Sequence, residues 1–153
     1  RKSFTIYDTQ DQKTLLKDCM KALNINDKDI TLQEIMGKIG KAKDNMQTPA
    51  AFMREHESNF REKKIADVYE MYQKKLKENN ALDFDDLISK TVELFKTDKE
   101  TLEFYQRKFQ YIMVDEYQDT NKVQYELVRL IAEKYKNICV VGDDDQCIYQ
   151  WRG

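Results

Sequence analysis

The sequence contains little glycine, proline and histidine, and each scarcity excludes a class of protein. Four glycines and one proline among 153 residues exclude a collagen-like or low-complexity chain. The single histidine, His56, excludes a metal site built from several histidines, such as the zinc helix of metalloproteases. No apolar run approaches the roughly 20 residues that a membrane-spanning helix needs. We therefore expect a soluble protein with no membrane partner.

Further limits on the kind of protein come from its cysteines, its net charge and its length. Cys19, Cys139 and Cys147 are odd in number and lack Cys-x-x-Cys spacing, which is typical of reduced thiols in the cytoplasm. Twenty-six basic and 28 acidic side chains give a net charge of −2, so any attraction to nucleic acid must be local. The length suits one domain, or one domain with an insertion. Because the chain starts at Arg1 and stops at Gly153 without an obvious cap or tail, we expect a piece of a longer protein.

The first two thirds of the sequence have the apolar spacing of amphipathic helices. After a short extended segment at residues 4–7, helix starts are indicated by capping residues, by a capping-box pattern and by a proline in a first turn. Apolar side chains between Ser58 and Lys77 recur at the intervals of one face of a long helix. The expected helices begin at or just after Asp8 or Thr9, Thr31, Thr48, Ser58, Asp83 and Asp98.

The pattern changes near residue 111. Residues 111–114 (Tyr-Ile-Met-Val) form a continuous apolar run that predicts a buried strand, and residues 138–141 (Ile-Cys-Val-Val) predict a second. A helix is expected between them, with Val123, Leu127, Leu130 and Ile131 facing inward. Two strands joined by such a crossover should lie parallel, with a right-handed connection. Their carboxyl ends then share the edge at which α/β sheets bind ligands.

Acidic residues follow both predicted strands. They are Asp115, Glu116 and Asp119 after the first strand and Asp143, Asp144 and Asp145 after the second. A cation would offset the repulsion between grouped carboxylates, and oxygen ligands without nearby His or Cys favour Mg²⁺. We therefore predict a magnesium-phosphate site at this edge. The alternative for Asp119, Asp143 and Asp145 is that they are solvated turn residues.

The pair Asp115-Glu116 has a specific interpretation in nucleotide hydrolysis. Asp115 would hold the magnesium, and Glu116 would orient and deprotonate the attacking water. A phosphate-binding loop of the form Gly-x-x-x-x-Gly-Lys-[Ser/Thr] is missing from the sequence. Gly40-Lys41 is followed by Ala42 and follows no predicted strand. These residues therefore contain only part of a phosphate site.

Two long motifs carry a family resemblance. Residues 114–121 read Val-Asp-Glu-Tyr-Gln-Asp-Thr-Asn, and residues 141–153 read Val-Gly-Asp-Asp-Asp-Gln-Cys-Ile-Tyr-Gln-Trp-Arg-Gly. They closely resemble the Walker B motif and the motif that follows it in superfamily 1 DNA helicases of the UvrD/Rep/PcrA type. Residues 82–87 (Leu-Asp-Phe-Asp-Asp-Leu) resemble a further family motif, and residues 4–8 resemble the segment after the early DNA-contact motifs.

The resemblance implies a domain organisation. The expected fold is α/β overall and mostly helical, with a helical insert subdomain and a partial RecA-like βαβ unit whose strands are parallel. Residues 1–14 would lead in from the first motor domain, residues 15–80 would form the helical insert (1B-like), and residues 81–153 would be part of the RecA-like motor domain.

The resemblance also implies roles for single residues. Asp115 corresponds to the magnesium ligand, Glu116 to the catalytic base, and Gln146 to the group that senses the γ-phosphate of ATP and links it to DNA. Tyr149, Trp151 and Arg152 correspond to single-strand contacts, which suits them because aromatic rings stack on any base. Cys147 and Gln150 depart mildly from the family pattern.

A mechanism follows from the spacing of these residues. Gln146 and Trp151 are five residues apart on one segment. Loss of the γ-phosphate at Gln146 would therefore move a base-stacking platform, which is the minimum for coupling ATP hydrolysis to translocation. The expected ligands are ATP, Mg²⁺, single-stranded DNA and a duplex junction, in DNA repair or replication. The phosphate loop and the second motor domain would belong to the rest of the parent chain, so we expect this piece alone to be inactive.

Two other functions remain open. A magnesium-dependent nuclease could use the same carboxylates, although it leaves the segment from Gln146 to Trp151 unexplained. A non-catalytic helical module could bind DNA or dock a partner. The region from Gly37 to Lys64 has a local charge of +3, which either lies along duplex phosphates or, as is more common for such residues, forms a solvated face. Its basic residues are Lys38, Lys41, Lys43, Arg54, Arg61, Lys63 and Lys64, and its acidic residues are Asp44, Glu55, Glu57 and Glu62.

Overall fold

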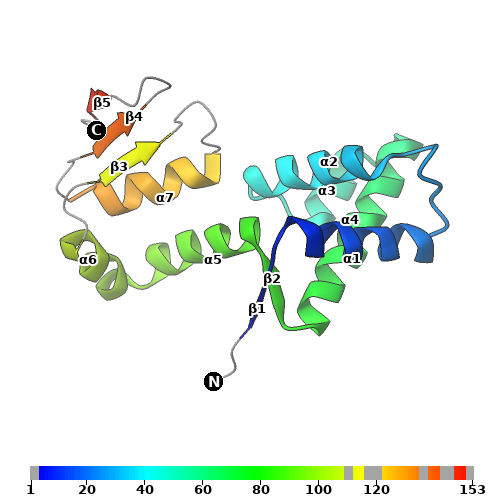
Figure 1. The fold of residues 1–153 in the computed structure, drawn as a ribbon, viewed down its shortest axis with the longest axis horizontal. Coiled ribbons are helices and arrows are strands. Elements are labelled where there is room, and N and C mark those ends of the chain that lie inside the picture. Colours follow the sequence, from blue (N-terminus) through cyan, green and yellow to red (C-terminus); the bar gives the residue numbers. More distant parts are fainter. Residues whose placement is uncertain (1–3, 109–111, 116–121, 135–137, 142–146, 151–153) are drawn as a thin grey trace. The chain divides into compact units, whose positions relative to one another are not determined.

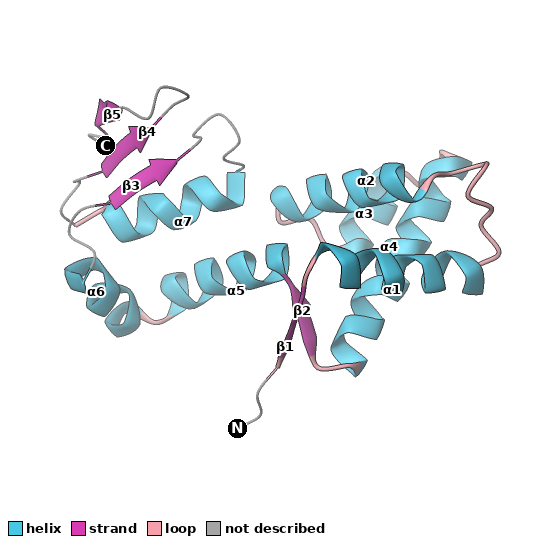
Figure 2. Cartoon of the chain, viewed as in Figure 1, coloured by secondary structure: helices cyan, strands magenta, loops and turns pink. Residues whose placement is uncertain are grey.

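The computed structural model describes residues 4–108, 112–115, 122–134, 138–141 and 147–150. The chain divides into two compact units, residues 1–87 and residues 88–153. Helices dominate the described part of both units (Figures 1 and 2). The prediction of a mostly helical α/β fold is confirmed.

The first unit consists of four helices and two short strands. In chain order these are β1 (Thr5–Tyr7), α1 (Thr9–Ala22), α2 (Leu32–Asp44), α3 (Pro49–Glu55), α4 (Phe60–Glu78) and β2 (Ala81–Asp83). The predicted caps at Asp8, Thr31 and Thr48 each accept a hydrogen bond from a backbone N–H of the first turn, as N-cap side chains do. The long helix α4 starts at Phe60, two residues after the predicted Ser58, because Asn59 is its cap.

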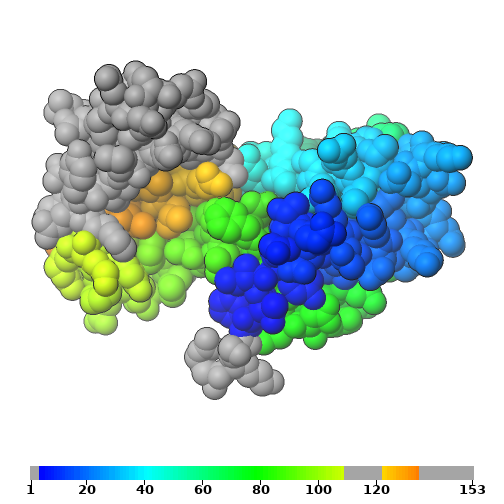
Figure 3. Space-filling view, in the orientation of Figure 1, coloured from blue at the N-terminus to red at the C-terminus, as the bar shows by residue number. Residues whose placement is uncertain are grey.

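The core of this unit lies between the helices. The predicted faces of α1 and α4 are buried, and Ile35 and Ile65 are fully inaccessible to solvent. Figure 3 shows β1 and α1, in blue, beside the green segment that contains α4 and β2. Buried apolar side chains of this core include Leu15, Leu16, Cys19, Met20, Ile30, Ile39, Phe52, Val68, Tyr69, Tyr72, Leu76 and Ala81.

Three helices end with a residue in the left-handed conformation, and none of these residues is glycine. They are Asn24, Met46 and Asn80, with φ of 57°, 55° and 52°. After α2 the amide of Met46 donates to Lys43 O and the amide of Gln47 donates to Ala42 O, which is the Schellman pattern. This pattern fixes the last turn of α2, which carries Lys43.

The strands β1 and β2 form a parallel pair, although the whole helical bundle separates them in sequence. Thr5 is in register with Ala81, Ile6 with Leu82, and Tyr7 with Asp83. Figure 1 shows the two strands side by side at the point where the chain enters and leaves the helices. The sequence predicted an extended segment at residues 4–7, but it did not indicate this pairing.

The second unit is a small α/β arrangement. Its first element is α5 (Phe84–Thr97), of which only the first turn belongs to the first unit. The elements that follow are α6 (Lys99–Lys108), β3 (Ile112–Asp115), α7 (Lys122–Ala132), β4 (Ile138–Val141) and β5 (Cys147–Gln150). β3 and β4 are parallel, which confirms the predicted strand–helix–strand unit. The antiparallel strand β5 was not predicted. Within the described residues, no helix combines the length and the apolar character that crossing a membrane requires.

Candidate functional site

The carboxyl ends of β3 and β4 form one edge. Asp115, the last residue of β3, is in register with Val141, the last residue of β4. The prediction that both strands end at a common edge is therefore confirmed at the level of the backbone. The other acidic residues predicted there, which are Glu116, Asp119, Asp143, Asp144 and Asp145, lie outside the described residues.

The strand β5 returns from this edge along β4. Cys147 is in register with Val141, and Gln150 is in register with Cys139 at the opposite end of β4. Because a strand rises about 3.3 Å per residue, β5 spans about 10 Å from its first residue to its last. Tyr149 is in register with Val140, next to a register shift between Val140 and Val141. Gln146, Trp151 and Arg152 flank β5 and lie outside the described residues.

Helices α5 and α7 share a second apolar core. Val92 and Phe95 of α5 pack with Val123 and Leu130 of α7, and α7 is the crossover between the two parallel strands. Figure 1 shows α7 along one face of β3 and β4. The Nε2 of Gln106 in α6 donates to Leu130 O at 2.9 Å, which satisfies a buried amide. The sequence predicted the inward side of α7 correctly.

A buried charge cluster lies in the first unit, and the sequence did not indicate it. Lys43 of α2 is 5% exposed, and its Nζ lies 2.6 Å from Asp83 Oδ2 and 3.0 Å from Asp86 Oδ1. The Tyr72 hydroxyl of α4 donates to the same Asp83 oxygen at 2.8 Å. Lys43 Nζ also lies 5.0 Å from the centre of the Tyr72 ring. The cluster therefore joins α2, α4, β2 and the first turn of α5.

Asp83 and Asp86 also cap α5. Asp83 Oδ1 accepts from the amide of Asp86 at 2.8 Å, and Asp86 Oδ2 accepts from the amide of Asp83 at 3.4 Å. The Nε2 of Gln73 lies 3.5 Å from Asp86 Oδ1. All four carboxylate oxygens thus face a donor, as buried charges require. The predicted cap at Asp83 is confirmed, and the motif at residues 82–87 gains a structural role.

Burial and the charge of Asp83 raise the pKa of two side chains here, Tyr72 and Asp85. Burial, followed by the charge of Asp83, raises the pKa of the Tyr72 hydroxyl far above its usual value, so this hydroxyl remains a donor. Burial and the charge of Asp83 likewise raise the pKa of the half-buried Asp85 carboxyl. The site therefore carries more negative charge than Lys43 alone balances.

The basic region at residues 37–64 loses part of its charge to ion pairs. Lys43 is buried against Asp83, Lys38 Nζ lies 3.0 Å from Glu62 Oε2, and Arg61 forms a two-pronged ion pair with Glu34. Three of the seven basic side chains are thus neutralised by carboxylates in the same unit. This weakens the interpretation of the region as a surface for duplex phosphates.

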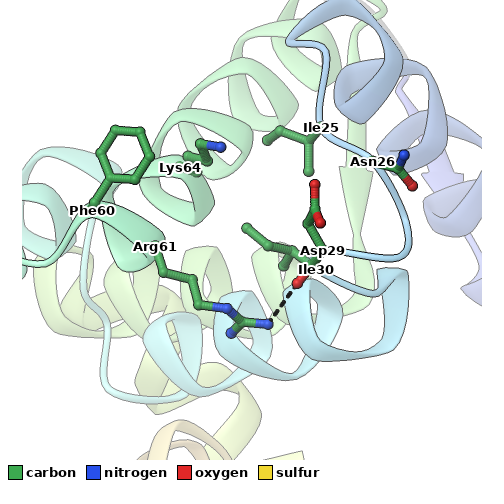
Figure 4. A pocket seen from close by; sticks show the side chains of 7 residues that line it. All are labelled: Ile25, Asn26, Asp29, Ile30, Phe60, Arg61 and Lys64. Atoms are coloured by element: carbon green, nitrogen blue, oxygen red, sulfur yellow. Dashed lines mark hydrogen bonds between the residues drawn. The ribbon is translucent and has the colours of Figure 1, made fainter.

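A surface pocket lies elsewhere on the helical bundle, between the loop after α1 and the first turn of α4 (Figure 4). Arg61 is held at its rim by a 2.9 Å hydrogen bond to Asp29 O. The Phe60 ring is 75% exposed, and Lys64 Nζ lies 4.8 Å from its centre. The pocket contains none of the predicted site residues. Among the residues with described side chains, no group of three His, Cys, Asp or Glu residues is arranged to hold a metal ion.

Comparison with known proteins shows similarity to helicases along the whole chain. The family model described as "UvrD/REP helicase N-terminal domain" matches residues 1–153. The chain is 52% identical over 152 residues to the protein named ATP-dependent DNA helicase PcrA in Staphylococcus epidermidis, covering 99% of this chain and 21% of that protein. It is 51% identical over the same length and coverage to the protein of the same name in Staphylococcus aureus. The chain thus spans about a fifth of the length of these relatives.

Proposed function

Because the chain belongs to the UvrD/REP helicase N-terminal domain family, we propose that it is part of the first motor domain of an ATP-dependent DNA helicase. The parent protein couples hydrolysis of ATP to movement on single-stranded DNA and to unwinding of duplex DNA, in repair or replication in the cytoplasm. The observation that supports this most directly is the register of Asp115 with Val141. It puts the last residues of β3 and β4 at one edge of a parallel pair, the kind of edge at which α/β sheets bind nucleotides.

The residue types at this edge suit a magnesium nucleotide. Asp115 ends β3, and the segments that follow both strands contain carboxylates, which are hard oxygen donors of the kind Mg²⁺ prefers. Asp115 would hold the ion, which neutralises charge on the phosphates when it is bound. Glu116 follows at once in the chain and would orient and deprotonate the attacking water.

The segment that contains β5 would carry the signal from nucleotide to DNA. Gln146 immediately precedes β5, whose first residue is beside the end of β4. Trp151 and Arg152 immediately follow the other end of β5. With Tyr149 they would contact single-stranded DNA by stacking and by pairing with phosphate. A change at Gln146 would therefore displace the DNA contacts through one short strand.

We propose that the chain is divided into three segments. Residues 1–14 lead in from the motor domain, residues 15–80 form the helical insert, and residues 81–153 return to the motor domain. The phosphate loop and the second motor domain are supplied by the rest of the parent, since they do not occur in these residues. The isolated chain should therefore neither hydrolyse ATP nor unwind DNA.

The test is the substitution Glu116→Gln in the full-length parent. ATP turnover on single-stranded DNA should fall by about 10²- to 10⁴-fold, which is the usual contribution of a general base, while nucleotide affinity is retained. Glu133→Gln, which changes an exposed carboxylate just after α7, is the matched control and should leave turnover unchanged. Turnover retained in the Glu116 variant would remove that residue from its role. Cleavage of DNA by the isolated chain with Mg²⁺ would instead favour the nuclease.

A further inference from the structure

The two apolar cores are connected by a short stretch of chain that contains three aspartates. The core of the helical bundle reaches Ala81 of β2, and the second core begins with Ile88 and Val92 of α5. Between them lie residues 82–87, in which Asp83 is 2% exposed and bonded to Lys43 and Tyr72. The first turn of α5 is thus attached to the helical bundle by buried polar contacts from α2 and α4.

From this arrangement we infer that Lys43, Asp83 and Asp86 form a clasp, and that Lys43 is a positioning residue for duplex unwinding. The clasp holds the first turn of α5 to the helical bundle within the first unit. The role of Lys43 in unwinding rests on the proposed helicase function, whereas the contacts of the clasp do not depend on it.

The geometry of the attachments shows what the contact of Lys43 adds. The chain joins the helical bundle to the strand pair at two places, from β1 into α1 and from α4 into β2, and β1 and β2 are adjacent. Ala81 of β2 and Tyr7 of β1 also pack against the core of the bundle. Lys43 lies on α2, which contains neither connection, so its bond to Asp83 adds a contact from a further helix. The Schellman turn after α2 holds the Lys43 backbone in place for this contact.

The position of α5 gives the clasp its functional consequence. The first turn of α5 is capped by Asp83 and Asp86, while Val92 and Phe95 on the same helix pack with α7. α7 is the crossover between the strands that end at Asp115 and Val141. Movement generated at this edge can therefore reach the helical bundle along one continuous helix, provided that its first turn is held. Without Lys43 the charges of Asp83 and Asp86 lose their cation, and the neutral donors of Tyr72 and Gln73 hold the turn less firmly.

The second core contains none of the three clasp residues, so the clasp should affect unwinding more than hydrolysis. In the full-length parent, Lys43→Met should keep ATP turnover on single-stranded DNA within about twofold. Duplex unwinding per ATP hydrolysed should fall by about tenfold, a size typical of altered coupling between sites. Lys41→Met is the matched control, because Lys41 is an exposed lysine in the last turn of the same helix. Asp86→Asn, which keeps the shape of the side chain, should reproduce the effect if Lys43→Met does not fold.

Hydrogen exchange of the same full-length variants tests the clasp without relying on activity. Backbone amides at the end of α2 and in the first turn of α5, about 40 residues apart, should both exchange faster in Lys43→Met and Asp86→Asn than in Lys41→Met. Unchanged exchange at either place would overturn the clasp. Faster exchange with the same unwinding per ATP as in Lys41→Met would overturn the positioning role. If the unmodified parent hydrolyses no ATP, the proposed function fails, while the exchange experiment still decides the clasp.

Discussion

Asp115 and Val141 are register partners at the ends of two parallel strands, although 26 positions separate them in the sequence. α7 makes this possible, because a helical crossover returns the chain to the start of the neighbouring strand. The pairing puts the ends of both strands at the same edge. The chemistry proposed for this protein depends on that edge.

Replacing Asp115 with asparagine in the full-length parent should weaken its use of magnesium. The substitution removes one negative charge from a proposed ligand of the ion, so the Mg²⁺ concentration for half-maximal ATP turnover should rise by at least about tenfold. A titration of turnover against Mg²⁺ measures this shift. Asp18→Asn, at an exposed position in α1, is the control and should leave the titration unchanged. The same midpoint in both variants would remove Asp115 from the metal site.

Trp151→Ala in the full-length parent should weaken binding to single-stranded DNA. Stacking of a base on an aromatic ring contributes about 1 to 3 kcal/mol, which corresponds to about a 5- to 150-fold loss of affinity. Fluorescence anisotropy with a labelled oligonucleotide measures this loss, and ATP affinity without DNA should be unaffected. Phe104→Ala removes an exposed aromatic ring of α6 and serves as the control. If both variants bind DNA equally well, Trp151 is not a stacking platform.

Lys43→Met should destabilise the first unit strongly. Removing one partner of a buried ion pair leaves carboxylates without compensation and costs about 3 to 5 kcal/mol. Urea unfolding followed by circular dichroism measures the loss. Adding Asp83→Asn to Lys43→Met should recover part of it, because one uncompensated charge is then removed. A double variant less stable than Lys43→Met would argue against a charge-based cost.

Asp85→Asn should stabilise the protein at pH 7. Burial, followed by the charge of Asp83, raises the pKa of this carboxyl in the folded state above its ordinary value. The folded protein therefore holds the proton more tightly, and its stability falls as pH rises from the unfolded pKa through the folded one. The asparagine variant should have the higher urea midpoint at pH 7, and this advantage should vanish below about pH 4.

The ion pair of Glu34 provides a control of opposite sign for this experiment. The hydrogen bond from Arg61 lowers the pKa of Glu34, so its contribution is present above the unfolded pKa and is lost as pH falls through the folded one. Glu34→Gln should therefore lower the urea midpoint at pH 7 but not in acid. Two variants that shift stability in the same direction at pH 7 would contradict the assigned causes.

Met46→Gly should stabilise the end of α2. Met46 has φ of 55° and is 47% exposed, so glycine relieves the backbone strain at little loss of apolar burial. The gain should be about 1 kcal/mol, measured as a shift in urea unfolding. Asn24→Gly, at the equivalent position after α1, should gain less, because asparagine tolerates the left-handed conformation. A loss of stability in Met46→Gly would mean that its side-chain contacts outweigh the strain.

Local patterns in the sequence predicted most of the elements. The caps at Asp8 and Thr31 and the apolar runs at residues 111–114 and 138–141 were informative because each depends on neighbours within a few positions. The parallel pairing of β3 with β4 followed from the helix between them. The roles of Glu116, Gln146, Trp151 and Arg152 remain predictions.

Long-range contacts were not predictable in the same way. Lys43 is one of many lysines in the sequence, and its partner Asp83 lies 40 positions away, so no periodicity connects them. The three-residue strand β1 is too short to indicate that it pairs with residues 81–83. The strand β5 has an irregular register with β4, and its Cys-Ile-Tyr-Gln sequence has no clear alternation.

Because β1 pairs with β2, the four-helix bundle is an insertion whose two ends lie next to each other. Tyr7 and Asp83 are in register, so the two ends of the segment at residues 8–80 emerge from adjacent strands. A crossover between parallel strands requires only a dozen or so residues. A single short helix could therefore bridge the same gap, and the bundle could be exchanged between related proteins without redesigning the strands that carry it. Such a graft would have to provide a new cation for Asp83, or replace this carboxylate with a neutral side chain.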